Sequence, residues 1–444
     1  MKSILMLCLV LLLATPAAKA TEAKDIQQFT LENGMQILVL EDDSIPNANM
    51  YLFWKVGSRN EYPGITGLSH FFEHMMFNGS EKYGPKMFDR TMEAAGGANN
   101  AYTTENLTVY TDWFPADALE LIFDLEADRI ANLDINAEVV ESERGVVASE
   151  RSTGLENSNF RTLHEEVKGV AFRAHPYSWP VIGHDSDIAN WTLEDLRQYH
   201  KTYYAPNNAV VVIAGAVKFD EVKKLARAYF EPIPAQPEPR NIHTKEPEQK
   251  GERRTYVHKE SVTSPNLMMA FHIPPTGHQD YYALQMLGEI LAKGNSSRLK
   301  QALVFEQKLA TNVMSYIPES FDANLFYLYA IATPGTSAEA LEQGLVEQIK
   351  LVIEQGVSEQ ELQKVKNSQL VSFYREMQTI NGKANTIGTY QVYFGDYREL
   401  FDLPAELEKV SAADIQRVAK TYLRKANSTV GILDNKEDSY AQDR

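Results

Sequence analysis

Hydrophobic and polar residues alternate along several short segments of the chain, which is the pattern of a β-strand with one buried face. The segments 35–40, 50–56 and 107–114 follow this pattern. Residues 116–131 instead repeat apolar positions every three or four residues, as an amphipathic helix does. A strand at 266–272 and a helix from about 279 to 291 follow later in the chain. Strands that pair as neighbours beside separate helices predict an α+β fold rather than a parallel, doubly wound sheet.

The chain divides into two similar halves. The segment 234–254 is rich in proline and charge and poor in apolar residues, which predicts a linker between an N-terminal domain at 21–233 and a C-terminal domain at 255–444. Residues 195–203 resemble residues 414–422, and both end in Lys-Thr-Tyr followed by Asn and an apolar strand. This ordered agreement favours gene duplication over coincidence between two ordinary helix–strand units.

A helix is predicted over residues 66–78, because its apolar residues fall on one stripe at helical spacing. That stripe consists of Leu68, Phe71, Phe72, Met75 and Met76. Thr66 and Ser69 offer side chains of the type that caps a helix, and Asn78-Gly79 is a stop signal. The predicted helix therefore has one face for the core and leaves the next face free for chemistry.

Two histidines lie one turn apart on that second face. His70 and His74 are spaced i and i+4, so their imidazole nitrogens can converge on a single Zn²⁺ ion. Glu73 shares the stripe and lies close enough to touch a metal-bound water without being a ligand. The order His-x-x-Glu-His inverts the commoner His-Glu-x-x-His and is the inverzincin signature.

A third zinc ligand is expected on a later helix, which Asn136 can cap and which runs from 137 to about 152. One face of this helix carries Val139, Glu143, Val146 and Glu150. Two carboxylates beside valines are costly to bury unless a cation meets them. We therefore predict Glu150 as the third ligand and Glu143 as the residue that orients a histidine. The alternative for Glu143 is a solvated helix charge.

The segment 67–80, together with the Glu143 and Glu150 pair, resembles the M16 zinc metallopeptidases, which include pitrilysin, insulin-degrading enzyme and the mitochondrial processing peptidase. The resemblance extends over most of the chain after residue 20, and residues 287–299 are similar to a stretch of the family's C-terminal domain. It implies two duplicated α/β-roll domains, each an antiparallel sheet packed with helices, that face each other around a chamber. It also implies one zinc ion per chain.

Residues 96–103 and 108–110 resemble the family's strand that carries extended substrate. The resemblance places the candidate substrate-binding residues on this strand: Ala98, Asn99, Asn100 and Ala101. Their alternative is an ordinary edge strand next to a glycine turn. Pairing through the main chain would demand unfolded peptides and tolerate many sequences.

Residues 1–20 predict a signal peptide that is cleaved after Ala20. Lys2 gives a positive start, 4–14 is an apolar run too short to span a bilayer, and Ala18-Lys-Ala20 is a cleavage site of small residues. We expect export, most simply to a bacterial periplasm. The single cysteine, Cys8, lies within this segment, so the rest of the chain has neither disulfides nor a catalytic thiol.

The net charge of −17 argues against nucleic acid or an anionic membrane as a partner, and no later segment is long and apolar enough for membrane insertion. The motif predicts a zinc metalloendopeptidase with Glu73 as general base. The alternatives are a non-catalytic peptide-binding or assembly subunit of an M16-type complex, and a metal transport or sensor protein. The remaining histidines, His164 among them, show no ligand spacing and are expected to be structural or on the surface. Residues 179–183 are expected to place a loop near the site.

The resemblance also implies a partner. The family uses an Arg and a Tyr seven residues apart in its C-terminal half to hold the substrate carbonyl and the oxyanion. The matching segment here, 303–313, places Val304 and Thr311 at those positions. Neither side chain can replace its counterpart, so we expect a homologous subunit to supply the Arg/Tyr pair, with this chain as the zinc-bearing half of a heterodimer. Arg298 and Tyr316 are nearby substitutes within the chain.

Overall fold

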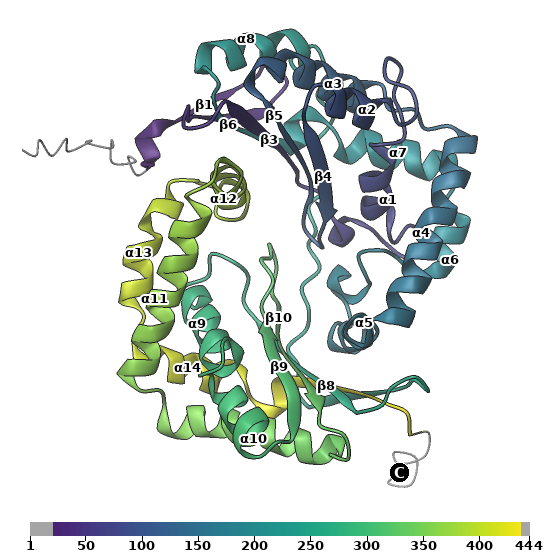
Figure 1. Ribbon diagram of the computed structural model, residues 1–444. Coiled ribbons are helices and arrows are strands. Elements are labelled where there is room, and N and C mark those ends of the chain that lie inside the picture. The colour runs from purple at the N-terminus through teal and green to yellow at the C-terminus, as the bar shows by residue number, and fades with distance from the viewer. Residues whose placement is uncertain (1–20, 437–444) are drawn as a thin grey trace, which may run out of the picture.

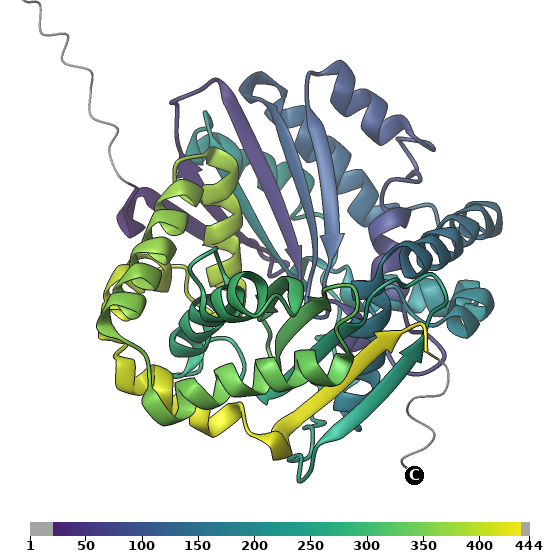
Figure 2. The same ribbon diagram turned by 60° about the horizontal axis from the view of Figure 1, so that its bottom comes forward.

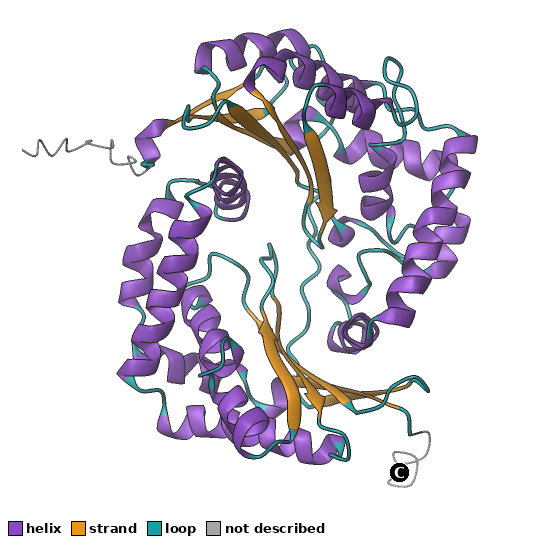
Figure 3. Cartoon of the chain, in the orientation of Figure 1, coloured by secondary structure: helices purple, strands orange, loops and turns teal. Residues whose placement is uncertain are grey.

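The computed structural model describes residues 21–436, and they form two sheet-and-helix halves that face each other (Figures 1 and 3). The predicted signal peptide lies outside the described residues. Within 21–436 no helix combines the length and the apolar character needed to cross a bilayer. The stretch between α8 (Phe219–Tyr229) and β7 (Arg253–His258) contains no helix or strand. The division into domains at 21–233 and 255–444 with a linker at 234–254 stays a proposal.

The first sheet has six strands, and their order in space differs from their order in the chain. From one edge to the other they are β1 (Ile26–Thr30), β2 (Gln36–Glu41), β6 (Ala209–Gly215), β3 (Asn47–Trp54), β5 (Thr108–Pro115) and β4 (Ala98–Thr103). All neighbours are antiparallel except β2 and β6. The strands expected from alternation are β2, β3 and β5, each shifted by one to three residues at its ends.

The second sheet repeats the first without its outermost strand. Its order is β7, β11 (Ser428–Asp434), β8 (Asn266–Ile273), β10 (Asn324–Ala332) and β9 (Ala310–Tyr316). The parallel pair is again at one side, where the yellow β11 lies beside the teal β7 in Figure 2. Asn208 and Asn427 occupy equivalent positions, and each donates to a tyrosine carbonyl five residues earlier at 2.8 Å. The predicted α+β fold of two duplicated units is confirmed.

Each sheet buries one face under helices of its own half. The first sheet is covered by α1 (Leu68–Met75), α2 (Met87–Ala94), α3 (Leu119–Ala131), α7 (Leu193–Tyr203) and α8. The second is covered by α9 (Tyr281–Ala292), α10 (Ala338–Gln355), α11 (Glu359–Glu376), α13 (Glu399–Lys409) and α14 (Ala412–Tyr422). Burying these apolar faces supplies the main driving force for each half.

The other faces of the sheets receive helices from the opposite half. The C-terminal helix α12 (Ile380–Tyr393) packs on β3 and β6, and the N-terminal helix α5 (Asn159–Ala171) packs on β7, β8 and β11. Gly388 allows the first contact, because a Cβ there would lie 2.0 Å from the ring of Phe53. This exchange of helices holds the two halves in a fixed relation around the space between them (Figure 1).

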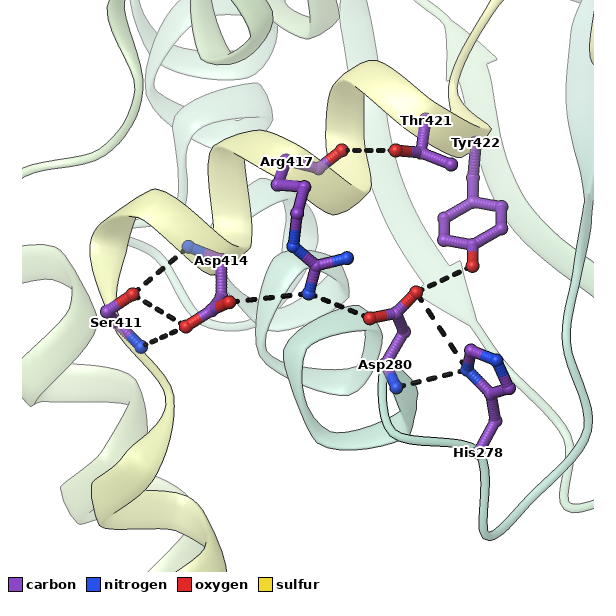
Figure 4. A network of polar contacts seen from close by, with 7 residues as sticks. All are labelled: His278, Asp280, Ser411, Asp414, Arg417, Thr421 and Tyr422. Carbon is purple, nitrogen blue, oxygen red and sulfur yellow. Dashed lines mark hydrogen bonds and ion pairs between the residues drawn. The ribbon is translucent and has the colours of Figure 1, made fainter.

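A polar network fixes the start of α9, the helix that follows β8 as α1 follows β3 (Figure 4). Asp280 accepts a hydrogen bond from the Tyr422 hydroxyl at 2.6 Å and pairs with Arg417 at 2.7 Å. Ser411 and Asp414 cap α14 by bonding each other's backbone N–H groups. The network ties the start of α9 to α14.

Candidate metal centre

Helix α1 begins at a glycine that no other residue can replace without strain. Gly67 has φ of +91°, and a Cβ there would lie 2.4 Å from the carbonyl oxygen of Ile182. The Glu61 carboxylate accepts hydrogen bonds from the backbone N–H groups of Gly67 and Ser69 at 2.7 and 2.8 Å. Burial raises the pKa of Glu61 to about 8. The expected capping by Thr66 and Ser69 is wrong, because a carboxylate from the preceding loop satisfies these N–H groups first.

All three predicted metal ligands converge beside one face of this helix. His70 and His74 of α1 meet Glu150 of α4 (Ala137–Asn157), and one ligand atom from each lies within 4.8 Å of the others. Glu150 Oε2 is 3.7 Å from His70 Nε2 and 3.4 Å from His74 Nε2. Zinc ligands at 2.0–2.2 Å in a tetrahedron are separated by about 3.4 Å. Two imidazoles and one carboxylate are also the donor types that zinc prefers, so these residues fit a zinc ion.

Glu143 fixes the orientation of one ligand. His74 Nδ1 donates to Glu143 Oε1 at 2.7 Å, and Asn78 Nδ2 donates to Glu143 Oε2 at 2.7 Å. The hydrogen bond from His74 lowers the pKa of Glu143 and keeps it ionised. Burial opposes a charge on His74, but Glu143 and Glu150 outweigh burial and raise its pKa to about 9. Burial, reinforced by His74, lowers the pKa of His70 to about 4.

Helix α4 buries a different stripe from the one expected. Val140 and Val147 are buried, whereas Val146 is 49% exposed. The expectation that Glu143 and Glu150 share a buried face with Val139 and Val146 is therefore wrong for Val146. The two carboxylates lie at the border of the buried stripe, where they reach α1 and still contact solvent. The helix also continues five residues beyond the predicted end.

Glu73 faces the same space without contacting the ligands' coordinating atoms. Its Oε2 accepts a hydrogen bond from Thr103 Oγ1 at 2.6 Å, and Thr103 is the last residue of β4. Burial raises the pKa of Glu73 above its ordinary value, and the bond from Thr103 partly offsets this. A half-buried carboxylate with a raised pKa beside a metal site has the properties of a general base.

Strand β4 lies at the edge of the first sheet and pairs only with β5 among the described strands. Ala98 and Asn100 are exposed on the face that looks into the space between the halves. Asn99 points the other way and donates to Asp89 of α2 at 3.0 Å, and Ala101 packs on the core. The role of these four residues in substrate binding stays a prediction.

A cavity of about 380 Å³ joins Glu73, His70 and Glu150 to residues that the sequence did not single out. The additional polar lining residues include Glu105, Arg151, Arg161, His164 and Lys168. His164, which was expected to be structural or on the surface, forms part of the cavity wall. Arg161, His164 and Lys168 are spaced as one polar stripe of α5. This spacing is the sequence pattern from which their common position could have been predicted. The loop at 180–182 also lines the cavity, near the expected place.

Comparison with known proteins identifies the family of this site. Residues 37–185 match the family described as insulinase (peptidase family M16), and residues 190–369 match the peptidase M16 inactive domain. The chain belongs to the M16 peptidase family. It is similar to the zinc protease PqqE of Helicobacter pylori, with 31% identity over 418 residues that cover 92% of each chain. It is also similar to an uncharacterized zinc protease of Bacillus subtilis, YmxG, with 24% identity over 395 residues covering 89% and 95%.

Solved structures agree with this assignment to the M16 family. A protease from Helicobacter pylori superimposes with a TM-score of 0.89 at 30% identity, covering 92% of this chain and 99% of that chain. The periplasmic protease PqqL from Escherichia coli has a TM-score of 0.78 at 18% identity, covering 94% of this chain and 48% of that chain. The second likeness shows the fold alone.

The described second half of this M16 chain has no histidine pair at the position that corresponds to the metal centre. The groove between α9 and β9 is lined there by Gln285, Gly288 and Glu289. Val304 and Thr311 are the residues expected at the positions of the family's Arg and Tyr. Val304 packs against the hydrophobic core of the second half. Thr311 bonds the carbonyl of Ile331 at 3.3 Å.

Neither nearby substitute reaches the metal cavity. Arg298 is held by both oxygens of Glu361, at 2.7 and 2.9 Å. Tyr316 lines the groove of the second half. All described residues that line the metal cavity come from the first half.

Proposed function

We propose that this chain is an exported zinc metallopeptidase that hydrolyses extended, unfolded peptides. One observation carries the proposal. Two imidazoles and a carboxylate converge at zinc-ligand spacing, and Glu73 faces the same cavity beside the free edge of β4. The names of the zinc protease relatives support the same class of chemistry.

His70, His74 and Glu150 would hold one zinc ion per chain, and Glu143 would keep the His74 ring oriented toward it. Zinc in such a site supplies an acidified water and polarises the scissile carbonyl. Three protein ligands leave a fourth position for water or substrate, which is the usual arrangement of catalytic zinc.

Glu73 would act as general base and then as general acid. Its carboxylate is held by Thr103 at 2.6 Å, and Glu73 lines the cavity. It takes a proton from the attacking water and returns it to the leaving amine. A pKa raised by burial suits both directions of this transfer.

Substrate would add to the open edge of β4 as a further strand, paired through its main chain. Ala98, Asn99, Asn100 and Ala101 would contact it. Because Thr103 ends the same strand and holds Glu73, a peptide on this edge would pass directly by the metal ligands.

A homologous subunit would complete the site. No residue of the described second half lines the metal cavity, and Val304 and Thr311 cannot supply the family's Arg and Tyr. This chain would thus be the zinc-bearing member of a heterodimer. Export rests on the predicted leader at 1–20, and a periplasmic location has support from the likeness to PqqL, which is a periplasmic protease.

The alternative is a non-catalytic peptide-binding or assembly subunit, which the match of residues 190–369 to an inactive domain favours. The complete set of His70, Glu73, His74 and Glu150 favours the peptidase. The deciding experiment incubates the zinc-loaded chain, alone and with candidate partner subunits, with a quenched fluorescent peptide. Cleavage that disappears with Glu73→Gln supports the peptidase. Peptide binding without cleavage under every condition supports the alternative.

A further inference from the structure

A second cavity, of about 340 Å³, lies where the end of β4 meets α9 and α12. Its walls combine aromatic rings with uncharged polar side chains, and they contain a single ionisable carboxylate among the described residues. Its aromatic residues and its carboxylate are Tyr102, Tyr281, Glu319, Tyr390, Tyr393 and Phe394, and Asn385 and three threonines contribute to the rest of the wall. No lysine, arginine or histidine of the described chain lines it. We call it the tyrosine cavity.

The aromatic walls are packed against one another and are therefore fixed before any ligand arrives. Tyr390 stacks on Phe394 with ring centroids 4.5 Å apart, and Tyr281 meets Phe394 edge-on at 6.0 Å. Tyr102 comes from the opposite half, and its hydroxyl lies 3.5 Å from Asn385 of α12. The two halves of the molecule thus build the cavity together.

The main chain at Glu319 is fixed, and the Glu319 carboxylate pairs with no cation within residues 21–436. Its carbonyl oxygen accepts a bond from Asn106 Nδ2 at 3.2 Å, and the next residue, Ser320, exchanges two hydrogen bonds with Thr276. Although the side chain contacts solvent, surrounding protein atoms raise its pKa. Because no basic side chain of the described chain lines this cavity, a ligand's cation could pair with the Glu319 carboxylate, and the faces of tyrosine rings attract cations as well.

The tyrosine cavity adjoins the metal cavity, because Tyr102 lines both. Successive residues of β4 point to opposite faces of the sheet. Thr103 points toward Glu73, and Tyr102 points to the face on which α12 packs. A peptide paired with this edge also sends alternate side chains to the two faces. A side chain close to the scissile bond would therefore enter the tyrosine cavity.

We propose that the tyrosine cavity binds a lysine or arginine side chain of the extended substrate. The proposal rests on the proposed function, because that function places a peptide on β4. The ammonium or guanidinium group lies against the tyrosine rings and pairs with Glu319, while its methylene stem covers the aromatic walls. An acidic side chain is repelled at the same place. Glu319 is thus a specificity-determining residue that takes no part in bond cleavage.

The test measures binding to the zinc-loaded Glu73→Gln chain, so that it does not depend on turnover. The probes are labelled, N-acetylated peptides of one flexible sequence, in which a single lysine or norleucine is moved through successive positions. At one position lysine should bind about tenfold more tightly than norleucine, as expected for a charge-assisted contact. Adding Glu319→Gln should remove this gain, and Glu319→Lys should make glutamate the preferred residue there. Glu347→Gln, an exposed acid of α10, should leave the gain unchanged.

Equal binding of the lysine and norleucine peptides at every position would overturn the proposal. So would a lysine preference that persists in Glu319→Gln. The same peptides are also measured without the N-acetyl group. If Glu319 tightens binding of a peptide with a free N-terminal amine but not of the lysine peptides, the assignment to a side chain is overturned. Thermal unfolding of each variant checks that it folds. If wild type cleaves no peptide, alone or with candidate partner subunits, while the Glu319-dependent preference is present, the peptidase proposal fails and the binding proposal stands.

Discussion

The Nδ1 atom of His74 donates to Glu143 at 2.7 Å, and Nε2 of the same ring lies 3.4 Å from Glu150. Because Nδ1 bonds to Glu143, Nε2 is the ring nitrogen that faces the space shared by Glu150 and His70, and it is free to bind a metal once it loses its proton. His70 lacks such a support, since its buried Nδ1 has no hydrogen bond among the described residues. The two histidines are thus oriented by different means, one by a carboxylate and one by packing.

This asymmetry predicts the effect of removing Glu143. Glu143→Ala should weaken zinc binding by about 10–100-fold, because the His74 ring loses its orientation and its preferred tautomer. Glu143→Gln should cost less, since an amide oxygen can still accept from Nδ1. A competition titration against a chelator measures both. Glu138→Ala, an exposed change in the first turn of the same helix, is the control. Affinity unchanged in Glu143→Ala would mean that packing alone orients His74.

Recognition through an open strand edge predicts a preference for unfolded substrates. A short flexible peptide should be cleaved, and the same sequence embedded in a stably folded protein should resist, because its backbone bonds are already satisfied. Mass spectrometry of timed digests makes the comparison. Destabilising the folded host should restore cleavage at the same bond. Equal rates on the peptide and on the stable host would contradict strand addition.

The wall of the metal cavity predicts a pH-dependent stability. Burial alone would raise the pKa of Glu105, but the Lys168 ammonium at 2.5 Å outweighs burial and lowers it to about 2. A depressed pKa gives stability that is present above the ordinary value of 4.5 and is lost as the pH falls toward 2. Glu105→Gln should therefore cost up to about 3 kcal/mol at pH 7.

The difference in free energy of unfolding between wild type and Glu105→Gln should shrink steadily between pH 4.5 and 3. Urea unfolding at several pH values measures the free energy of unfolding of both proteins. Glu166→Gln, an exposed neighbour on α5, should show no such trend. A constant difference between wild type and Glu105→Gln from pH 7 to 3 would show that the ion pair does not stabilise the fold.

The proposal that a homologous subunit supplies the Arg/Tyr pair predicts that this subunit raises the rate of peptide cleavage. A homologous subunit that carries an Arg/Tyr pair but no zinc motif should increase peptide cleavage by about 10²–10³, the usual contribution of one oxyanion donor. Replacing the partner's Arg and Tyr should abolish the increase without preventing complex formation, which gel filtration checks. Full activity of the lone chain, abolished by Glu73→Gln, would show that no partner is needed.

The sequence predicted the elements whose signal is local. The spacing of His70 and His74 on one helix and the alternation in β2, β3 and β5 depend only on near neighbours. The cap of α1 could not be predicted in this way, because Glu61 reaches it from the preceding loop and competes with Thr66 and Ser69. The buried stripe of α4 shifted from Val146 to Val147 for a similar reason, since packing against α1 decides which side faces inward.

The tyrosine cavity could not be predicted from the sequence for a different reason. Tyr102, Glu319 and Tyr390 are far apart in the chain, and the packing of the two halves against each other brings them together. The second half of the duplication could be recognised from its Lys-Thr-Tyr segment, but the helix exchange leaves no local pattern in the sequence.

The zinc content of purified variants tests the central claim most directly. Wild type and Glu73→Gln should each hold about one zinc per chain, as a site with three protein ligands does. His74→Ala should lose the metal, and Glu150→Gln should bind it much more weakly, because a neutral amide replaces the only anionic ligand. Elemental analysis after gel filtration, followed by chelator competition, gives stoichiometry and affinity. Zinc held as tightly by Glu150→Gln as by wild type would contradict the assignment of His70, His74 and Glu150 as the metal centre.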